Sequence, residues 1–416
     1  MSIASRVGRA AAKAIVVRAA STMKEGTLAV RLPDGKLRAF GRGEPRASLH
    51  VLNDAFFSRI VAGGEIGFGE AYMDDLWRAD DLVALLELGI RNRRNIGLDM
   101  AWLGRLSRLR DRRWHLGRRN TAAGARRNIG AHYDLSNDLF RLFLDETMTY
   151  SCAYFTSPDE TLKDAQRNKY RRLCERVDLR PSDHVLEIGC GWGGFAIFAA
   201  GTYGCGVTTI TISREQRELA RERVAAAGLS DLVDVRFCDY RDVTGMFDKI
   251  VSIEMFEAVG AEYFETFFRV CDRALRPGGL MALQTITVPD RSFATLRDGV
   301  NWMQKYIFPG GMLPSIGEIE RALRPTQLVI GGAEDIGPHY ALTLRRWRER
   351  FLANADAVRA LGFDDRFLRM WEYYLAASEA GFLTRNTGDL QITFEKPAGR
   401  AVPRFARAEQ RAGILV

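Results

Sequence analysis

The stretch Val185-Leu186-Glu187-Ile188-Gly189-Cys190-Gly191-Trp192-Gly193-Gly194 decides the fold of this chain. Apolar residues and one carboxylate run into four glycines, which is typical of a buried strand that ends in a tight turn. Glycine permits a positive φ and has no Cβ, so a ligand can lie directly on the backbone there. In an open α/β sheet, ligands bind beyond the carboxyl ends of the strands. The stretch therefore predicts a cofactor site after a first strand over His184–Gly189.

Composition limits the class of protein. At 416 residues, 47% of them hydrophobic, the chain is long enough for two domains with sizeable cores. The formal net charge of +8 favours an anionic partner, either nucleic acid or an anionic membrane surface. No apolar run approaches the ~18 residues of a membrane-spanning helix. The six cysteines form no CxxC pair, so we expect no metal site, no disulfides and a reducing, cytoplasmic setting.

The N-terminal part predicts a small α+β domain over residues 1–95. Apolar runs at Thr27–Leu32 and Leu37–Phe40 flank Pro33-Asp34-Gly35, which indicates a β-hairpin. The glycine-rich stretch 63–69 predicts loops, and a helical pattern resumes over Asp80–Arg91. The segment Met1–Ala20 is basic and free of acids. It fits an ordinary N-terminal helix or a membrane-surface helix, and a transit peptide is a third interpretation.

An arginine-rich run over residues 91–127 follows, with Trp102, Leu106 and Trp114 among the arginines. It fits a solvated linker, or an amphipathic segment that binds anionic headgroups with about 1 kcal/mol for each basic residue. Nucleic acid is another candidate for such a patch. Because no nucleic-acid-binding module is recognisable, we expect no nucleic-acid partner. We place a basic linker at 96–127 and a basic tail at 397–416.

From residue 128 onward, strands alternate with helices. This alternation predicts a parallel, doubly wound sheet over residues 128–396. Residues 291–385 are expected to form a mostly helical insertion, and the last strand is expected to close the sheet. The predicted strands are His184–Gly189, Gly206–Ile212, Val233–Cys238, Asp248–Glu254, Leu280–Thr287 and Leu390–Glu395, and helices are predicted over 194–203, 213–227 and up to about 275.

The glycine run favours one class of cofactor. A dinucleotide fold needs GxGxxG, whereas Gly189-x-Gly191-x-Gly193-Gly194 is a tighter turn with Glu187 shortly before it. This pattern resembles the E/DxGxGxG motif of class I S-adenosylmethionine (SAM)-dependent methyltransferases. Such enzymes place an acid for the adenine amine after the third strand, where this chain has Asp239. The resemblance implies SAM as the cofactor.

Further motifs narrow the resemblance. They are NIGAHYDLSN at 128–137, MTYSCAYF at 148–155, TIS-x-x-Q at 211–216, DYRD at 239–242, IEMFEAVG at 253–260 and KYIFPGG at 305–311. Together they resemble the cyclopropane-fatty-acyl-phospholipid synthase family, which includes the mycolic acid cyclopropane synthases. The resemblance implies an α/β fold, in which a class I methyltransferase Rossmann-like doubly wound sheet with a helical insertion joins a small N-terminal α+β domain for lipid binding and dimerisation.

The same resemblance implies which residues hold SAM. Tyr150 and Ser151 would lie near its methionine part, with the glycine turn beneath. Thr211 and Gln216 would lie near the ribose. The full implied set is Tyr133, Tyr150, Ser151, Gly189, Gly191, Gly193, Thr211, Gln216, Asp239, Tyr240 and Arg241.

The implied reaction is methyl(ene) transfer from SAM to the double bond of an unsaturated acyl chain in a membrane phospholipid. An alkene is a poor nucleophile, so the carbocation that forms must be shielded from water. Aromatic faces can stabilise a desolvated cation by about 2 kcal/mol. Candidate aromatic residues are Tyr133, Tyr150, Phe155, Phe256, Trp302, Tyr306, Phe308 and Tyr374. For any single one a core role is the stronger interpretation, and the prediction concerns them as a set that lines an acyl slot.

By resemblance, a bound bicarbonate ion then takes a proton from the cation, and ring closure gives a cyclopropane. The catalytic set would comprise Cys152, Glu257, Gln284, Ile286 and Tyr340. Two positions depart from the family pattern, since Ala258 and Gln284 stand where the family has histidine. Glutamine can donate a hydrogen bond to the ion but cannot relay a proton. Loss of a proton from a neighbouring chain carbon would instead give a methyl-branched alkene.

The resemblance also implies a location and partners. We expect a cytoplasmic enzyme that is peripheral to the inner membrane, docks on an anionic surface and forms a homodimer. A small-molecule or sphingolipid methyltransferase stays open as an alternative. A catalytically silent lipid-binding module with the same fold is a further one, although the intact glycine turn and Glu257 argue against it.

Overall fold

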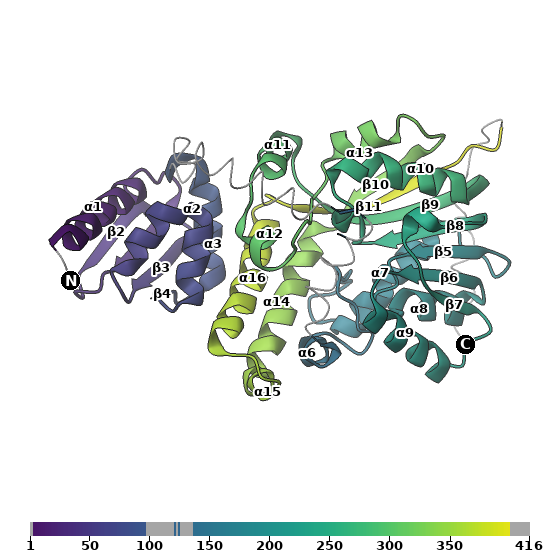
Figure 1. The fold of residues 1–416 in the computed structure, drawn as a ribbon, viewed down its shortest axis with the longest axis horizontal. Coiled ribbons are helices and arrows are strands. Elements are labelled where there is room, and N and C mark those ends of the chain that lie inside the picture. Colours follow the sequence, from purple (N-terminus) through teal and green to yellow (C-terminus); the bar gives the residue numbers. More distant parts are fainter. Residues whose placement is uncertain (1–2, 97–119, 122–123, 125–135, 400–416) are drawn as a thin grey trace.

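A seven-stranded sheet in the order β10-β11-β9-β8-β5-β6-β7 forms the centre of the larger unit (Figure 1). The structure is a computed structural model and describes residues 3–96, 120, 121, 124 and 136–399. Strands β7, β6, β5, β8 and β9 run parallel to one another, as the alternation predicts. The strands are β5 (His184–Ile188), β6 (Gly206–Thr211), β7 (Val233–Phe237), β8 (Phe247–Ile253), β9 (Leu275–Thr287), β10 (Val329–Asp335) and β11 (Gly388–Glu395).

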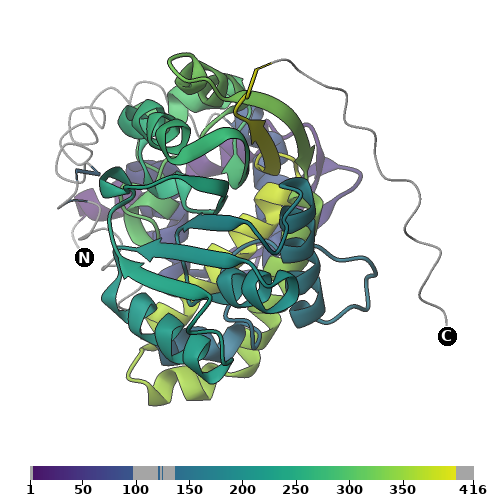
Figure 2. The same cartoon turned by 90° about the vertical axis from the view of Figure 1, so that its right-hand side faces the viewer.

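Alternation along β5 explains why helices cover both faces of this sheet (Figure 2). Val185 packs in one core with Phe195, whereas Leu186 packs in a second core with Phe267. Successive side chains of a strand point to opposite faces, so a strand that is apolar on both sides must be covered on both sides. The helices of the first side are α7 (Leu162–Arg176), α8 (Gly194–Tyr203) and α9 (Arg214–Ala226), and those of the second are α10 (Phe264–Ala274) and α13 (Ile316–Leu323).

The far edge of the sheet differs from the prediction. Strand β11 runs antiparallel to β9 and also to β10, so the sheet is mixed rather than wholly parallel. Strand β10, not β11, closes this edge. Strand β10 carries no sequence signal, because its residues are mostly exposed, with Val329 at 54%, and it lacks the apolar pattern of a buried strand.

The insertion between β9 and β11 is mostly helical, as predicted. Two long helices, α14 and α16, pack against each other and separate the two units in Figure 1. The remaining helices are short. Besides α13, the helices of this region are α11 (Asp290–Asp298), α12 (Trp302–Tyr306), α14 (Gly337–Ala353), α15 (Ala355–Ala360) and α16 (Asp365–Leu383), and α6 (Asn137–Phe143) packs beside α14.

The N-terminal unit is a four-stranded sheet in the order β2-β1-β3-β4 with three helices. The predicted hairpin is present, since Leu28 pairs with Phe40 in antiparallel register. The N-terminal segment forms a helix whose Ala12 is buried in the core. The elements are α1 (Ile3–Ala20), β1 (Gly26–Arg31), β2 (Leu37–Arg42), β3 (Arg46–Val51), α2 (Ala55–Met73), β4 (Trp77–Arg78) and α3 (Leu82–Ile96).

The prediction of loops over residues 63–69 is wrong, because this stretch lies inside α2. Gly64 introduces a kink with φ 54. Gly69 allows a close approach instead of a turn, since a Cβ there would lie 2.5 Å from the Trp302 ring. Gly69 therefore permits close packing of α2 against Trp302. A run of glycines in a closely packed helix cannot be told from a loop by sequence alone.

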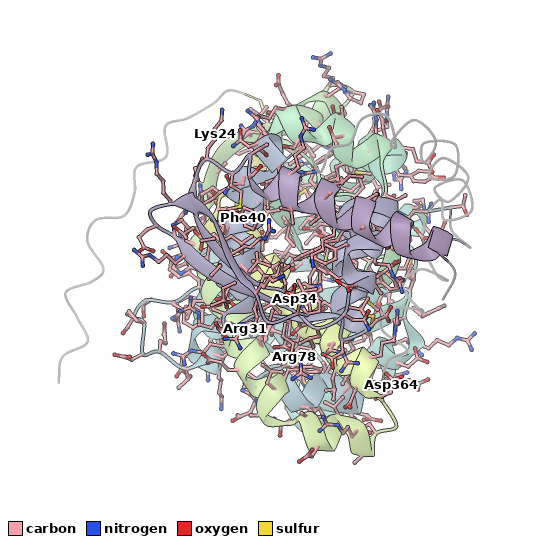
Figure 3. The ribbon with its side chains drawn as sticks, turned by 90° about the vertical axis from the view of Figure 1, so that its left-hand side faces the viewer. Lys24, Arg31, Asp34, Phe40, Arg78 and Asp364 are labelled. Carbon is pink, nitrogen blue, oxygen red and sulfur yellow. The ribbon has the colours of Figure 1, made fainter. Side chains whose placement is uncertain are left out.

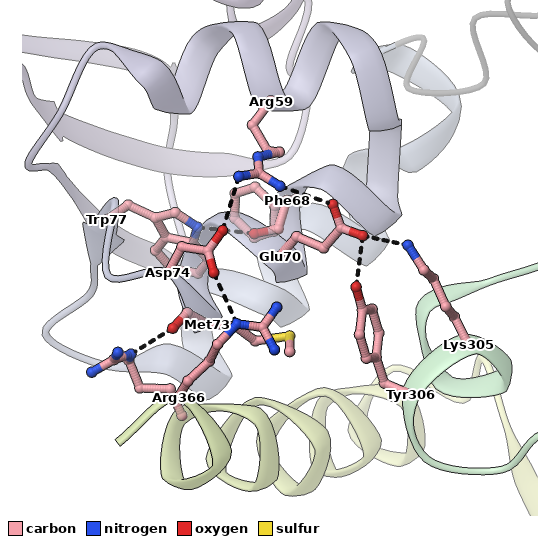
Figure 4. A network of polar contacts seen from close by, with 10 residues as sticks. Arg59, Phe68, Glu70, Met73, Asp74, Trp77, Lys305, Tyr306 and Arg366 are labelled. Atoms are coloured by element: carbon pink, nitrogen blue, oxygen red, sulfur yellow. Dashed lines mark hydrogen bonds and ion pairs between the residues drawn. The ribbon is translucent and has the colours of Figure 1, made fainter. Parts of the chain in front are cut away.

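The two units share one hydrophobic core and a polar network (Figure 4). The Glu70 carboxylate on α2 accepts hydrogen bonds from Lys305 Nζ at 2.5 Å and from the Tyr306 hydroxyl at 2.7 Å. On the same face, Asp74 accepts from Arg366 Nε at 3.0 Å. These contacts tie the small unit to α12 and α16 of the insertion.

Candidate functional site

The glycine turn after β5 has the conformation that the sequence predicts. Gly189, Gly191 and Gly193 have φ values of 99, 48 and 83. The N–H groups of Gly189 and Cys190 donate to the Ile210 carbonyl at 3.0 and 2.9 Å, which anchors the turn to β6. A Cβ on Gly189 would lie 2.9 Å from the Met255 Cβ, whereas one on Gly191 would meet nothing within 4 Å. The turn is therefore tight on one side and open on the other.

The open side faces a cavity with an empty volume of about 1100 Å³, part of it solvent. Most of the predicted SAM contacts line it. Gly193 does not; it caps α8 and faces Ala220 instead. Tyr133 lies outside the described residues. The predicted residues that line the cavity are Tyr150, Ser151, Gly189, Gly191, Thr211, Gln216, Asp239, Tyr240 and Arg241.

Polar side chains at the ends of β6 and β7 hold each other in place. The Thr211 hydroxyl donates to Gln216 Oε1 at 2.9 Å, which fixes the amide at the start of α9. Arg241 donates to Asp239 through Nε at 2.8 Å and Nη2 at 2.7 Å. This forked pair orients the carboxylate, which is buried and yet borders the cavity.

Three donors converge on Glu254 at the end of β8. Its Oε1 accepts the main-chain N–H of Cys152 and the Gln284 side-chain amide, both at 2.8 Å. Its Oε2 accepts the Tyr340 hydroxyl at 2.6 Å. Burial raises the pKa of Glu254, while these hydrogen bonds and the charge of nearby Lys169 act to lower it. Glu254 also lines the cavity, so one carboxylate joins the cavity to the predicted catalytic residues.

Two further acids lie behind Glu254. Glu257 Oε1 accepts the Thr285 hydroxyl at 2.9 Å and the Ile286 N–H at 2.5 Å. Burial, followed by repulsion from Glu254, raises the pKa of Glu257 to about 8. The same two causes raise the pKa of Asp389 well above its usual range, and Asp389 accepts a second hydrogen bond from the Gln284 amide at 3.1 Å.

Burial shifts the pKa values of two further groups beside this cluster, Lys169 and the Cys152 thiol. Lys169 is fully buried and donates to the Ser151 hydroxyl at 2.6 Å, and burial lowers its pKa to about 8. Burial also raises the pKa of the Cys152 thiol well above its ordinary value. A buried thiol of this kind is a poor nucleophile. The Cys152 contribution to the site is its main-chain N–H.

Comparison of the sequence with known protein families assigns the chain to one of them. A family model described as mycolic acid cyclopropane synthetase matches residues 120–392, which is well over half of the chain. The chain belongs to this family. It is therefore a SAM-dependent methyltransferase with the class I α/β fold, as the sequence predicts.

Individual relatives match this family member over a longer part of the chain than residues 120–392. The tuberculostearic acid methyltransferase of Mycobacterium tuberculosis is 46% identical over 366 residues, covering 85% of each chain. The cyclopropane-fatty-acyl-phospholipid synthase of Escherichia coli is 37% identical over 364 residues, covering 85% of this chain and 89% of its own. A mycolic acid cyclopropane synthase solved with SAH and CTAB has a TM-score of 0.61 at 32% identity, covering 65% of this chain and 98% of that one.

The structure brings the predicted catalytic residues of this synthetase-family chain into one cluster but centres them on a residue that the prediction missed. Cys152, Gln284 and Tyr340 surround Glu254, whereas Ile286 contacts Glu257. Lys169 and Asp389 were missed as well. The signal for Glu254 was present, because a carboxylate directly after a buried strand, in IEMFEAVG, stands at the ligand edge of the sheet.

The predicted aromatic residues separate into two groups. Tyr150 lines the cavity and hydrogen-bonds through its hydroxyl to that of Tyr374 at 2.7 Å. The Tyr374 ring lies 5.7 Å from that of Phe308. Phe256, by contrast, is fully buried in the core beneath α10 and stacks on Phe264. Phe256 is a core residue because the η2 turn (Phe256–Ala258) directs it away from the cavity.

Proposed function

We propose that this family member transfers the methyl group of SAM to a carbon of the double bond in an unsaturated acyl chain of a membrane phospholipid. The observation that carries the proposal is the aromatic cluster that packs behind the cavity at Tyr150. Tyr150 lines the cavity, and its ring lies 5.2 Å from both Phe140 and Trp347. The hydroxyl pair of Tyr150 and Tyr374 links this cluster to α16. An apolar, aromatic environment beside a methyl donor suits an acyl chain.

The residues around the cavity fit SAM. The open space at Gly191 leaves room for the methionine part against the backbone, and Ser151 and Tyr150 border the same end. Thr211 and Gln216 would hold the ribose, and Asp239 would accept the adenine amine. When bound, SAM supplies an electrophilic methyl group. The protein excludes water around it and faces the developing cation with aromatic rings, which stabilise a desolvated cation by about 2 kcal/mol.

The cation has two fates, and each has its own support. Ring closure, which the sequence predicts, agrees with the family model and with the name of the E. coli relative. Methylation without a ring agrees with the name of the M. tuberculosis relative, which matches at higher identity over the same share of the chain. The two products have the same mass, so the fate must be read from the structure of the product.

The membrane partner is part of the proposal. On the side seen in Figure 3, the N-terminal unit exposes basic residues, among them Lys24 before β1, Arg31 and Arg78. The edge strand β2 adds exposed Arg38 and Arg42. Exposed basic residues near an anionic bilayer each contribute about 1 kcal/mol, so this face would hold the enzyme at the inner membrane from the cytoplasmic side. No helix in the described ranges is both long and apolar enough to cross the bilayer.

The proposal also assigns a function to each segment of the chain. Residues 1–95 would bind lipid and support a homodimer, and residues 128–396 would carry the methyl transfer. The basic linker 96–127 and the tail 397–416 would add charge near the membrane, and both lie largely outside the described residues.

Lipid analysis tests the proposed function. Cells that express the chain should accumulate phospholipid acyl chains heavier by one CH₂ unit, and derivatisation of double bonds separates a ring from a branched alkene. An unchanged lipid profile, with SAM consumed on a soluble substrate instead, would reject a membrane phospholipid as the substrate. Modified sphingolipid in place of phospholipid would reassign the lipid class.

A further inference from the structure

The resemblance implies that a bound bicarbonate ion is the base that ends the reaction, and the structure of this chain departs from that expectation. A bicarbonate ion would be held by Cys152, Glu257, Ile286 and Tyr340. In the structure, the Cys152 N–H and the Tyr340 hydroxyl both donate to Glu254. The Ile286 N–H donates to Glu257. Side-chain carboxylates already engage the donors that would hold the ion, so the residues present do not fit bicarbonate.

We propose that the carboxylate of Glu254 is itself the general base of the reaction and replaces an added anion. This inference rests on the proposed function, because it assigns the proton-accepting step of that same site. Glu254 is the one acid of the cluster that borders the cavity, whereas Glu257 and Asp389 do not. A base must come within hydrogen-bonding reach of the proton that it takes, and Glu254 alone of the three has that access.

Gln284 positions this base. Its Oε1 accepts the side-chain amide of Gln391 at 3.0 Å, which turns its own amide toward Glu254. Glutamine at this position can only donate from its amide nitrogen, so it supports a carboxylate and cannot exchange protons with it. The residue that departs from the family pattern is therefore the partner that a built-in carboxylate needs.

The backbone of Glu254 supports a functional role. Glu254 has φ 47, in the left-handed region, and its N–H donates to the Gln284 carbonyl at 2.8 Å. A non-glycine residue held there costs about 1 kcal/mol or more, and such strain persists at sites where the surroundings impose it. The strained turn directs the carboxylate back toward Cys152 and Tyr340 instead of along the strand.

Two buried carboxyl oxygens of the cluster, Glu257 Oε2 and Asp389 Oδ1, have no hydrogen-bond partner among the described residues. Burial raises the pKa of both groups, so their neutral, protonated forms are favoured and they do not compete with Glu254 for the negative charge. The charge of buried Lys169 and the three hydrogen bonds that Glu254 accepts favour its ionised form, which a base requires.

The step is balanced without any other reactant. The π electrons of the alkene form a new C–C bond to the methyl carbon while the C–S bond of SAM breaks, which leaves a carbocation. For the ring, a C–H bond of the added methyl group then breaks and its electron pair closes onto the cationic carbon. For the branched alkene, a C–H bond on the chain carbon next to the cationic centre breaks and its electron pair forms the new double bond. The proton goes to a carboxylate oxygen of Glu254. After the product leaves, this proton passes to water through the cavity.

Substitution of Glu254 in the full-length protein tests the proposal. Glu254→Gln should lower the rate of lipid methylation by about 10²- to 10⁴-fold, which is the usual contribution of a general base. SAM affinity should change little. Glu254→Gly removes the carboxylate, suits φ 47 and opens space, so added formate or bicarbonate should restore part of its rate. The matched control is Asp248→Asn, at the opposite end of β8, where the carboxylate accepts the His184 N–H at 2.9 Å.

The wild-type protein supplies the second arm. In buffer stripped of carbon dioxide, its rate on unsaturated phospholipid vesicles should equal the rate after bicarbonate is added. A rate that rises severalfold with bicarbonate would overturn the proposal, as would a Glu254→Gln variant that binds SAM and keeps its rate. If the wild type forms no lipid product under any condition, the proposed function fails and this inference fails with it. An active wild type that needs bicarbonate defeats the inference alone.

Discussion

The side-chain amide of Gln284 donates to Oε1 of Glu254 at 2.8 Å and to Oδ2 of Asp389 at 3.1 Å. One amide nitrogen therefore bridges two buried carboxyl groups at the carboxyl end of the sheet. Gln284 Oε1 is itself engaged by Gln391, so every polar atom of this side chain has a partner. The residue that the sequence marks as a departure from its family is the centre of a complete hydrogen-bond network.

Gln284→His should slow lipid methylation without changing the ratio of ring to branched product. A neutral imidazole has one donor, so it cannot serve both Glu254 and Asp389, and an unpaired buried partner costs about 1–3 kcal/mol. The product ratio should persist because the base is still Glu254. Rates and derivatised lipids measured on one preparation give both quantities. A changed ratio at an unchanged rate would show that position 284 selects the product instead.

Gly191→Ala should weaken SAM binding at least tenfold, because the added methyl group enters the cavity. Gly228→Ala is a matched control, since both glycines have positive φ and neither would place its Cβ within 4 Å of another atom. Each substitution should cost about 1–2 kcal/mol of unfolding free energy from backbone strain. Only Gly191 lines the cavity. Calorimetric titration with SAM and denaturant unfolding separate the two effects, and equal SAM affinities would place the cofactor elsewhere.

The stability of the SAM-free protein should fall as the pH rises from about 4.5 to about 8. Burial raises the pKa of Glu187 from 4.5 to about 8. Its stabilising contribution is complete below the unfolded-state pKa, where both states are protonated. It is lost progressively as the unfolded state ionises and the folded state does not, until the pH passes the folded-state pKa.

Glu187→Gln should therefore flatten this pH dependence, as read from urea unfolding at several pH values. Asp248→Asn is the control, because hydrogen bonds hold the pKa of Asp248 below its usual 3.8. Its contribution is constant over the same pH range, so this substitution should shift the curve and leave its slope. An unchanged slope in Glu187→Gln would mean that Glu187 is not protonated in the folded protein.

Glu70→Ala should reduce lipid methylation while SAM affinity is retained. The substitution removes the acceptor that links α2 to Lys305 and Tyr306 of the insertion, and it should lower the unfolding free energy by about 1–2 kcal/mol. Glu87→Ala is the matched control, since that carboxylate pairs with Arg91 inside α3. Vesicle-based and SAM-binding assays compare the two variants. Equal lipid rates would show that the inter-unit network does not support catalysis.

Much of the fold of the larger unit can be predicted from its sequence. The glycine turn, helix α8 and strand β6 obey local rules of periodicity and chain conformation, so their predicted bounds agree with the structure to within a residue. Strand β10 could not be predicted, because its partner is distant in sequence and its own residues are exposed. The same limit applies to Glu254. Its position after β8 was visible, but its role depends on donors from α14, β9 and the segment before α7 that only the folded chain brings together.

The most direct measurement is the fate of a deuterium-labelled methyl group. The purified protein is given SAM with a trideuterated methyl and vesicles of monounsaturated phospholipid in bicarbonate-free buffer, and the acyl chains are analysed by mass spectrometry after double-bond derivatisation. We predict that label enters the acyl chain at the former double bond and that one proton or deuteron is lost for each methyl gained. Glu254→Gln should bind SAM but form the product at least about 10²-fold more slowly. Label that reaches only the headgroup or another acceptor, or that enters the chain equally in Glu254→Gln, would contradict it.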